Sequence, residues 1–284
     1  MLECVPNFSE GRNARTVAAI AEAIGKTRGV ALLGHEMDAD HNRSVFTFAG
    51  EDRAVVDAAV RAVQVASELI NLSGHAGVHP RVGAADVVPF IPLEASTMQE
   101  AVAAAHRAGR EIWAHAGVPV YFYGEAALRD SRRRLELVRR PGFDGCPQDV
   151  GDVPSHPTAG ASVVGARDFL LAFNADLKTK DVNVAKEIAR KIRASSGGFP
   201  HVKAIGLYLE SRQCAQVSMN LTKYSEINLE GLYSAIASAA AVADCEVIGF
   251  VPERAYQQDR AFFARASNFN ESRILERRLR ELLP

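Results

Sequence analysis

The chain has 284 residues, 48% of them hydrophobic and 24% charged, a balance typical of a soluble globular protein with one large or two modest domains. Its formal net charge of -1, from 33 basic and 34 acidic side chains, lacks the basic excess of nucleic-acid-binding proteins. The four cysteines lack the CxxC spacing of a zinc site. The sequence has no signal-peptide pattern and no apolar run long enough to span a membrane, so we expect a cytoplasmic protein.

Hydrophobic periodicity predicts the order β-α-β-β-α-β in the first half of the chain. The two phenylalanines of the third strand, Phe46 and Phe48, share one face. Val56, Val60 and Val63 form one stripe of the second helix. The expected elements are strand 2–8, helix 13–27, strands Val30–Leu33 and Ser44–Ala49, helix 52–70 and strand 85–90.

The second half repeats this order, which is the ferredoxin-like arrangement of helices on one face of a mostly antiparallel sheet. We therefore expect an α+β fold of two ferredoxin-like subdomains, residues 1–173 and 174–284. The expected elements are strand Phe169–Phe173, helix 180–195, a hairpin of Val202–Leu209 and Ala215–Leu221, helix 229–243, strand Glu246–Val251 and a solvated helix over Glu271–Leu283.

Additional elements are expected between the two halves. Thr97 and Glu100 have the spacing of a capping box that opens a helix to about residue 116, and Val118–Tyr123 resembles a strand. Arg129–Arg140 resembles a basic helix whose Arg132–Arg134 run faces solvent. Residues 141–160, with four prolines and no periodicity, are expected to be a functional loop or a linker.

The most unusual stretch holds His75, His79, Arg81 and Asp86 within twelve residues, directly before a strand. The spacing of the two histidines would suit a metal site on a helix, but Pro80 and the neighbouring glycines disfavour helix, and no third ligand is indicated. A turn whose histidines bond only to backbone is a second interpretation. A histidine in such a loop is also suited to acid/base chemistry, because its pKa lies near neutrality.

Two other clusters are candidates for binding. Asp38, Asp40, His41, Asn42 and Arg43 precede a strand and could orient an amidine-bearing acid, or they could form an Asx turn that caps the strand. The small residues from Ser155 to Arg167 would allow a flat ligand to approach the backbone, or they could be a plain connection between domains.

Five segments resemble the formiminotransferase domain in sequence and in order. They are Cys4–Gly11 (CVPNFSEG), His41–Arg43 (HNR), Gly77–Gly83 (GVHPRVG), Pro119–Gly124 (PVYFYG) and Gln216–Asn220 (QVSMN).

The resemblance implies transfer of the formimino group of N-formimidoyl-L-glutamate to N5 of tetrahydrofolate, in histidine degradation. The alternatives are formyl transfer between 5-formyltetrahydrofolate and glutamate, another amidine donor, or folate binding without catalysis. Tetrahydrofolate would be a co-substrate, without a metal. The resemblance also implies a cleft between the subdomains and a homodimer.

The resemblance assigns catalysis to His79, with Glu36, Asp38 or Asp40 as the assisting carboxylate. Asn42, Arg43 and Arg81 are expected to bind the substrate, the arginines through its carboxylates. The folate-contacting loop corresponds to Ser155, His156, Pro157, Thr158, Ala159, Gly160, Ala161, Ser162, Val163 and Val164.

Overall fold

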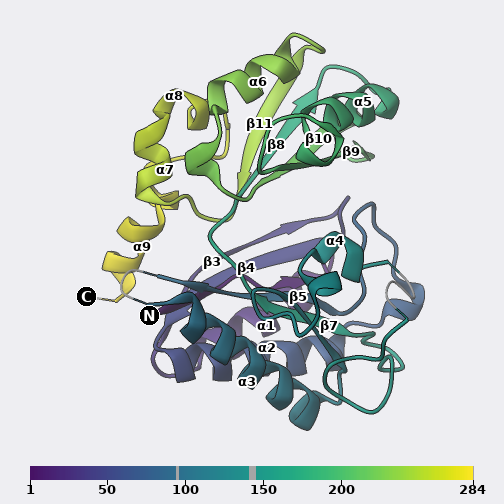
Figure 1. Cartoon of the computed structure of the whole chain (residues 1–284), viewed down its shortest axis with the longest axis vertical. Helices are drawn as coiled ribbons and strands as arrows, with labels where there is room; N and C mark the ends of the chain where they lie inside the picture. The colour runs from purple at the N-terminus through teal and green to yellow at the C-terminus, as the bar shows by residue number, and fades with distance from the viewer. Residues whose placement is uncertain (94–95, 141–144, 284) are drawn as a thin grey trace. The chain divides into compact units, whose positions relative to one another are not determined.

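The computed structural model describes residues 1–93, 96–140 and 145–283. The chain divides into two compact units, Met1–Asp168 and Phe169–Pro284. Each unit has its own β-sheet and its own apolar core, as the two-unit α+β prediction requires. Figure 1 follows the chain from the first unit (purple to teal) into the second (green to yellow). No helix of the described ranges combines the length and apolar character needed to cross a membrane.

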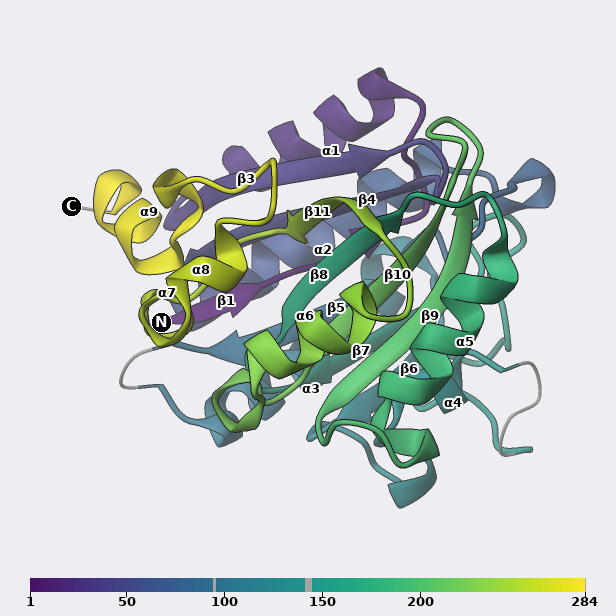
Figure 2. The ribbon, with the colours of Figure 1, turned by 90° about the horizontal axis from the view of Figure 1, so that it is seen from above.

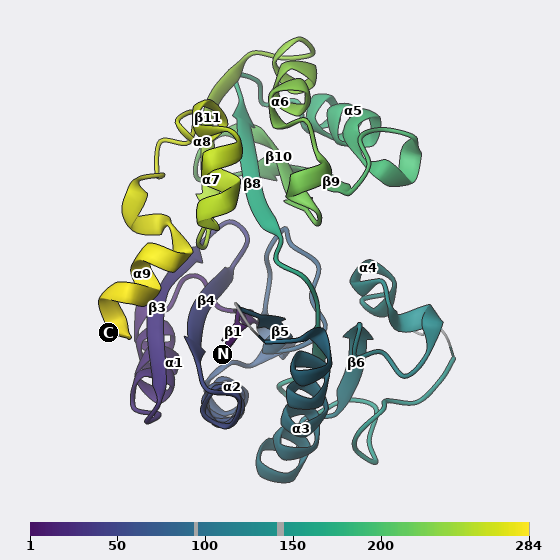
Figure 3. The ribbon, with the colours of Figure 1, turned by 60° about the vertical axis from the view of Figure 1, so that its left-hand side comes forward.

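The first unit contains the predicted β-α-β-β-α-β order, extended by two strands. Within the described residues its seven strands follow the order β3-β4-β1/β2-β5-β7-β6, and β7 pairs in parallel with both β5 and β6. In Figure 3 the outer strands β3 and β6 are seen at opposite edges of this unit. The strands are β1 (Leu2–Cys4), β2 (Asn7–Phe8), β3 (Val30–Asp38), β4 (Arg43–Gly50), β5 (Ala85–Pro92), β6 (Val120–Gly124) and β7 (Ser162–Ala166).

Three helices cover one face of this sheet (Figure 1). The predicted valine stripe of the second helix is buried, as are Phe46 and Phe48 of β4. The predicted capping box is confirmed, because Thr97 and Glu100 bond each other's backbone at the start of the third helix. A cap of this kind stabilises a helix by about 1 kcal/mol. The helices are α1 (Ala14–Gly25), α2 (Asp52–Leu69), α3 (Met98–Ala116) and α4 (Leu135–Val138), with 3-10 turns η1 (Leu72–Gly74) and η2 (Asp130–Arg132).

The strand β7 was not predicted from the sequence. Ser162, Val163 and Val164, assigned to the folate loop, lie in this strand and are fully buried. A parallel strand between two neighbours is covered on both faces, so it has no polar alternation by which to recognise it. The preceding segment, 145–161, contains isolated bridges and turns but no strand, while residues 141–144 lie outside the described part.

The predicted basic helix Arg129–Arg140 is wrong. The structure has only η2 and the single-turn α4 there, and Arg132 is buried instead of facing solvent. Its guanidinium donates to the buried carboxylate of Asp149 at 2.8 Å and lies 4.8 Å from the ring centre of Tyr121. A buried arginine is stable only when it is paired, and Asp149 supplies that partner from a later segment.

The second unit has the ferredoxin-like order in its sheet, β11-β8-β10-β9, with every pairing antiparallel among the described strands. Figure 2 shows α5 and α6 on one face of this sheet. The predicted hairpin is confirmed, with Cys214 opposite Leu209. The elements are β8 (Leu171–Leu177), α5 (Val182–Ile192), β9 (Val202–Leu209), β10 (Cys214–Leu221), α6 (Leu229–Ala237), β11 (Val242–Ile248), α7 (Glu253–Gln258), α8 (Arg260–Phe263) and α9 (Leu275–Leu282), with 3-10 turns η3 (Ala194–Ser196), η4 (Tyr224–Glu226) and η5 (Glu271–Arg273).

Several boundaries in this unit differ from the prediction, and the largest shift lies between the last predicted helix and strand of the sheet. The helix expected over 229–243 ends at Ala237, and the strand expected from Glu246 begins at Val242. The alanine-rich sequence favours helix locally, but pairing of β11 with β8 outweighs that small preference. The C-terminal helix is solvated on one side only, since Leu275 and Leu279 are buried.

Candidate functional site

The segment that carries His79 is a loop between η1 and β5, and the side chain of Arg81 holds it in shape. The guanidinium of Arg81 donates to the carbonyl oxygens of His41 at 3.0 Å and His79 at 2.9 Å. It also contacts Nδ1 of His75 at 2.6 Å. These bonds tie the loop to the turn before β4, so the two histidine-bearing segments of the sequence analysis lie together.

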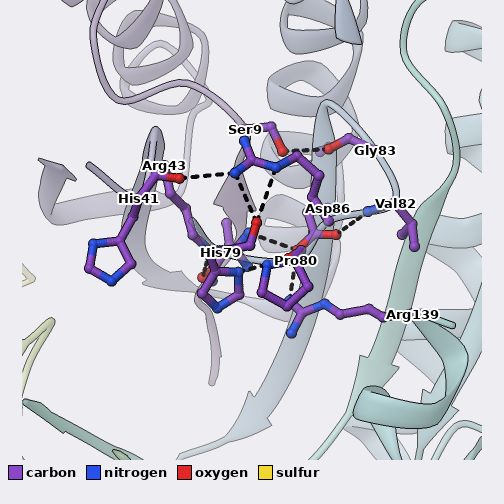
Figure 4. A network of polar contacts seen from close by, with 12 residues as sticks. Ser9, His41, Arg43, His79, Pro80, Val82, Gly83, Asp86 and Arg139 are labelled. Atoms are coloured by element: carbon purple, nitrogen blue, oxygen red, sulfur yellow. Dashed lines mark hydrogen bonds and ion pairs between the residues drawn. The ribbon is translucent and has the colours of Figure 1, made fainter. Parts of the chain in front are cut away.

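The ring of His79 is partly buried, and one of its nitrogens is fixed (Figure 4). Nδ1 lies 2.7 Å from the carbonyl oxygen of Pro80. A carbonyl oxygen only accepts hydrogen bonds, so Nδ1 must carry a hydrogen and donate it. In the neutral ring, Nε2 is then the nitrogen with the lone pair. No described residue bonds to Nε2, which leaves it able to accept a proton from a substrate.

The surroundings of His79 favour its neutral form. Burial lowers the pKa of His79 well below its usual value near 6.5, and the positive charges of Arg43 and Arg139 lower it further. The carboxylate of Asp86 acts in the opposite direction but does not compensate. His79 is therefore unprotonated at neutral pH, which is the state a general base needs.

The charges around His79 belong to a buried cluster centred on Asp86, which is the acidic residue of the predicted histidine-rich stretch. Oδ2 of Asp86 accepts from Arg43 and from Arg139, each at 2.7 Å, and Oδ1 accepts from the backbone of Val82 at 2.8 Å. Burial alone would raise the pKa of Asp86, but the two arginines bring it to about 2. One carboxylate between two guanidinium groups leaves a net positive charge beside His79.

The predicted substrate-binding residues Asn42 and Arg43 are both engaged within the protein. Asn42 has a φ of 46°, a conformation that asparagine tolerates better than most residues. Its side-chain amide accepts from the backbone of Gly11 at 3.0 Å and donates to the carbonyl of Ala76 at 3.0 Å. The guanidinium of Arg43 donates to the carboxylate of Asp86 and to the side-chain oxygen of Asn7. Together with Arg81, these two residues shape the loops that surround His79.

The three candidate carboxylates lie in one stretch but have different surroundings. Glu36 lies on β3, and Asp40 lies in the turn that follows, where its carbonyl accepts from the backbone of Val78. Asp38 ends β3 and accepts from both the backbone and the Nδ1 of His41, at 2.8 and 2.9 Å. The ring of His41, in turn, lies with its centre 6.3 Å from that of His79.

An open cavity of about 610 Å³ adjoins this group of loops. Its wall includes Arg12 and Arg15, at the start of α1, together with Asn42 and His75. The sequence analysis did not single out these two arginines. The sequence did contain a signal for them, because they flank Asn13, whose side chain caps α1. A helix N-terminus with two arginines attracts carboxylates.

The first part of the predicted folate loop is bonded directly to the segment after His79. Ala84 donates to the carbonyl of Ala159 at 2.8 Å, and Ala161 donates to that of Val82 at 3.0 Å. Within the loop, Nδ1 of His156 accepts from the backbone of Ala159 at 3.1 Å. Neutral His156 therefore carries its hydrogen on Nε2, and residues 155–161 form a turn bonded to the segment that follows His79, at Val82 and Ala84.

The metal interpretation of His75 and His79 was left open by the sequence. In the ranges 1–93, 96–140 and 145–283, no group of three or more histidine, cysteine, aspartate or glutamate side chains is arranged to hold a metal ion. His75 instead bonds to Arg81; burial, followed by the charge of Arg81, lowers its pKa.

Comparison with known proteins agrees with the resemblance. Residues 1–167 match the N-terminal subdomain of the formiminotransferase domain, and residues 172–279 match the formiminotransferase domain. The chain belongs to the formiminotransferase family. It is similar to the glutamate formimidoyltransferases of Thermoplasma acidophilum (38% identity, covering 98% of this chain and 97% of that protein) and Streptococcus pyogenes serotype M1 (39%, covering 98% of each). It is also 39% identical to the formimidoyltransferase-cyclodeaminase of Gallus gallus, over 93% of this chain and 52% of that longer protein.

The two family matches follow the two units of the structure, since they meet between residues 167 and 172 and the units meet at residues 168 and 169. The whole cluster around His79 lies in the first unit, together with the loop 155–161. The formiminotransferase relatives therefore share the part of the chain that carries the candidate chemistry as well as the ferredoxin-like second unit.

Proposed function

We propose that this chain is a glutamate formimidoyltransferase, which moves the formimino group of N-formimidoyl-L-glutamate to N5 of tetrahydrofolate. The observation that supports it most is the neutral imidazole of His79, whose Nε2 has no partner among the described residues and whose loop is bonded to residues 155–161. The similarity to two full-length glutamate formimidoyltransferases points to the same reaction.

The reaction needs proton movements that His79 is suited to begin. N5 of tetrahydrofolate attacks the formimino carbon and must lose its proton as the tetrahedral intermediate forms. Nε2 of His79 takes this proton, while the Pro80 carbonyl accepts from Nδ1–H and stabilises the resulting imidazolium. A positioned base of this kind contributes about 10²–10⁴-fold to a rate, and holding both substrates together contributes more.

The cavity at the start of α1 is our proposed site for the carboxylates of the glutamate donor. Arg12 and Arg15 lie on its wall, and Asn42 connects that wall to the His79 loop. Arg43 and Arg81, which the sequence suggested for this role, are already bonded to Asp86 and to backbone carbonyls. We assign them to shaping the site, and Arg12 and Arg15 to binding the donor's carboxylates.

The pterin of tetrahydrofolate is proposed to contact the fixed turn at residues 155–161. The Nε2–H of neutral His156 is a suitable donor for the ring nitrogens and carbonyl of the pterin. The hydroxyl groups of Ser155 and Thr158 contact the carbonyl oxygen and Nδ1 of His156, and so help to hold this turn in shape. Ser162, Val163 and Val164 would support this turn from within the sheet, because their side chains are buried in β7. We further propose that the enzyme is a cytoplasmic homodimer and needs no metal.

The test is transfer activity of His79→Asn, in which the amide can still donate to the Pro80 carbonyl while Nε2 is lost. We expect kcat to fall by about 10²–10⁴-fold with folate affinity unchanged. His115→Asn, at an exposed histidine in α3, is the matched control and should keep full activity. Activity of His79→Asn within a few-fold of wild type would contradict the assignment.

The donor decides between the proposed reaction and its alternatives. Wild-type enzyme should use formimidoylglutamate in preference to formimidoylglycine and to 5-formyltetrahydrofolate with glutamate. A preference for the formyl donor would identify a formyltransferase. Tight folate binding with no transfer from any of the three would identify a binding protein.

A further inference from the structure

We propose that His41, held by Asp38, is a second acid/base residue of this site and gives the proton to the departing glutamate nitrogen. The inference rests on the proposed function and divides its two proton movements between two imidazoles. His41 belongs to the HNR segment, for which the sequence suggested substrate orientation, and Asp38 was a candidate helper of His79.

Asp38 fixes which nitrogen of His41 is available to a substrate. Oδ1 of Asp38 accepts from the backbone nitrogen of His41 at 2.8 Å and lies 2.9 Å from its Nδ1. A carboxylate only accepts, so Nδ1 carries a hydrogen and Nε2 is the reactive nitrogen, as in His79. No described residue bonds to Nε2 of His41. The side chain is 10% exposed, so the ring is held in place while a small part of it reaches solvent.

The rings of His41 and His79 lie close enough to act on one intermediate. The ring centres of His41 and His79 are 6.3 Å apart, and their planes are inclined by 49° (Figure 4). The intermediate has the incoming and the departing nitrogen on one carbon atom, so proton partners on two sides of that carbon can serve the two nitrogens without any exchange between the steps. Two imidazoles at this separation can each serve one of them, whereas a single ring must turn or exchange its proton between the steps.

The charged groups that face His79 and His41 have opposite signs. His79 faces the guanidinium groups of Arg43 and Arg139, which disfavour a second proton on it. His41 faces the carboxylate of Asp38, and the two form an ion pair when His41 is protonated. Arg81 also contacts His41, by donating to its backbone carbonyl. Groups with opposite surroundings are the usual pattern of an acid and a base that act together.

The proton movements balance as follows. The lone pair of N5 forms a bond to the formimino carbon, the electrons of the C=N bond move to the imino nitrogen, and Nε2 of His79 takes the proton of N5. The bond from carbon to the glutamate nitrogen then breaks as the C=N bond re-forms, and Nε2–H of protonated His41 gives its proton to that nitrogen. His79 ends with one proton more and His41 with one fewer, and exchange with water restores both.

The experiment compares His41→Asn with His79→Asn on two kinds of donor. Asparagine can preserve the bond that Nδ1 makes in each case and removes Nε2. One donor is formimidoylglutamate, whose amine must be protonated as it leaves. The others are formimidoyl derivatives of 3- and 4-aminobenzoate, whose weakly basic amines leave with little help.

We expect kcat of His41→Asn to fall by about 10²–10³-fold with formimidoylglutamate, with KM within a few-fold, and by less than tenfold with the aminobenzoate donors. His79→Asn should lose activity with all donors. Equal losses of His41→Asn on both kinds of donor, or wild-type rates with formimidoylglutamate, would overturn the inference while leaving the proposed function intact. Wild-type enzyme that transfers from none of these donors would overturn the proposed function and the inference with it.

Discussion

Replacement of Asp86 by asparagine tests the buried charge cluster beside His79. The amide has the shape of the carboxylate and can still accept from the backbone of Val82, but it cannot neutralise Arg43 and Arg139. Arg43 is almost fully buried and cannot turn to water. Burial lowers its pKa to about 10, so its side chain still carries a positive charge at pH 7. The change therefore leaves an uncompensated charge inside the first unit.

Two routes give the size of the effect. The fall in the pKa of Asp86 from 3.8 to about 2 corresponds to about 2 kcal/mol by which the folded state favours the ionised form. Removal of one partner from a buried ion pair costs about 3–5 kcal/mol. We expect a loss in the free energy of unfolding of about 2–5 kcal/mol at pH 7, which is a fall in Tm of roughly 5–15 °C for a unit of this size.

The assay is urea denaturation of wild type and Asp86→Asn between pH 7 and pH 2. A lowered pKa in the folded state means that the carboxylate stabilises the fold above pH 3.8 and loses this effect as the pH falls to about 2. The difference between the two proteins should therefore be constant from pH 7 to 5 and shrink below pH 4. A difference under 1 kcal/mol at pH 7, or one that does not change with acid, would refute the reasoning.

Two further predictions concern the same loops. Arg139→Gln removes one of the charges that lower the pKa of His79, so the acidic limb of the kcat/KM profile should move to higher pH; an unmoved limb would contradict this. Gly83→Ala places a Cβ 1.9 Å from the carbonyl oxygen of Ala161, so we expect a loss of at least about 2 kcal/mol in urea denaturation and weaker folate binding. Gly74→Ala, where no atom lies within 4 Å, is the control and should be close to neutral.

The sequence by itself determined the elements whose signals are local. The stripe of Val56, Val60 and Val63 required a helix buried on one side, and the Thr97–Glu100 spacing required its capping box. Such signals depend on periodicity and on bonds across one helical turn, which neighbouring residues decide among themselves. The family was also visible in the sequence, because its motifs are short segments in a fixed order.

Only the tertiary structure decided which charges meet. Asp86 pairs with Arg139, 53 residues away, and Arg132 is buried against Asp149, although the local sequence around both arginines resembles a solvated basic helix. The strand β7 exists because β5 and β6 border it on both sides. The free energy of these contacts comes from desolvation and pairing between distant segments, and neither quantity is encoded in the residues next to each group.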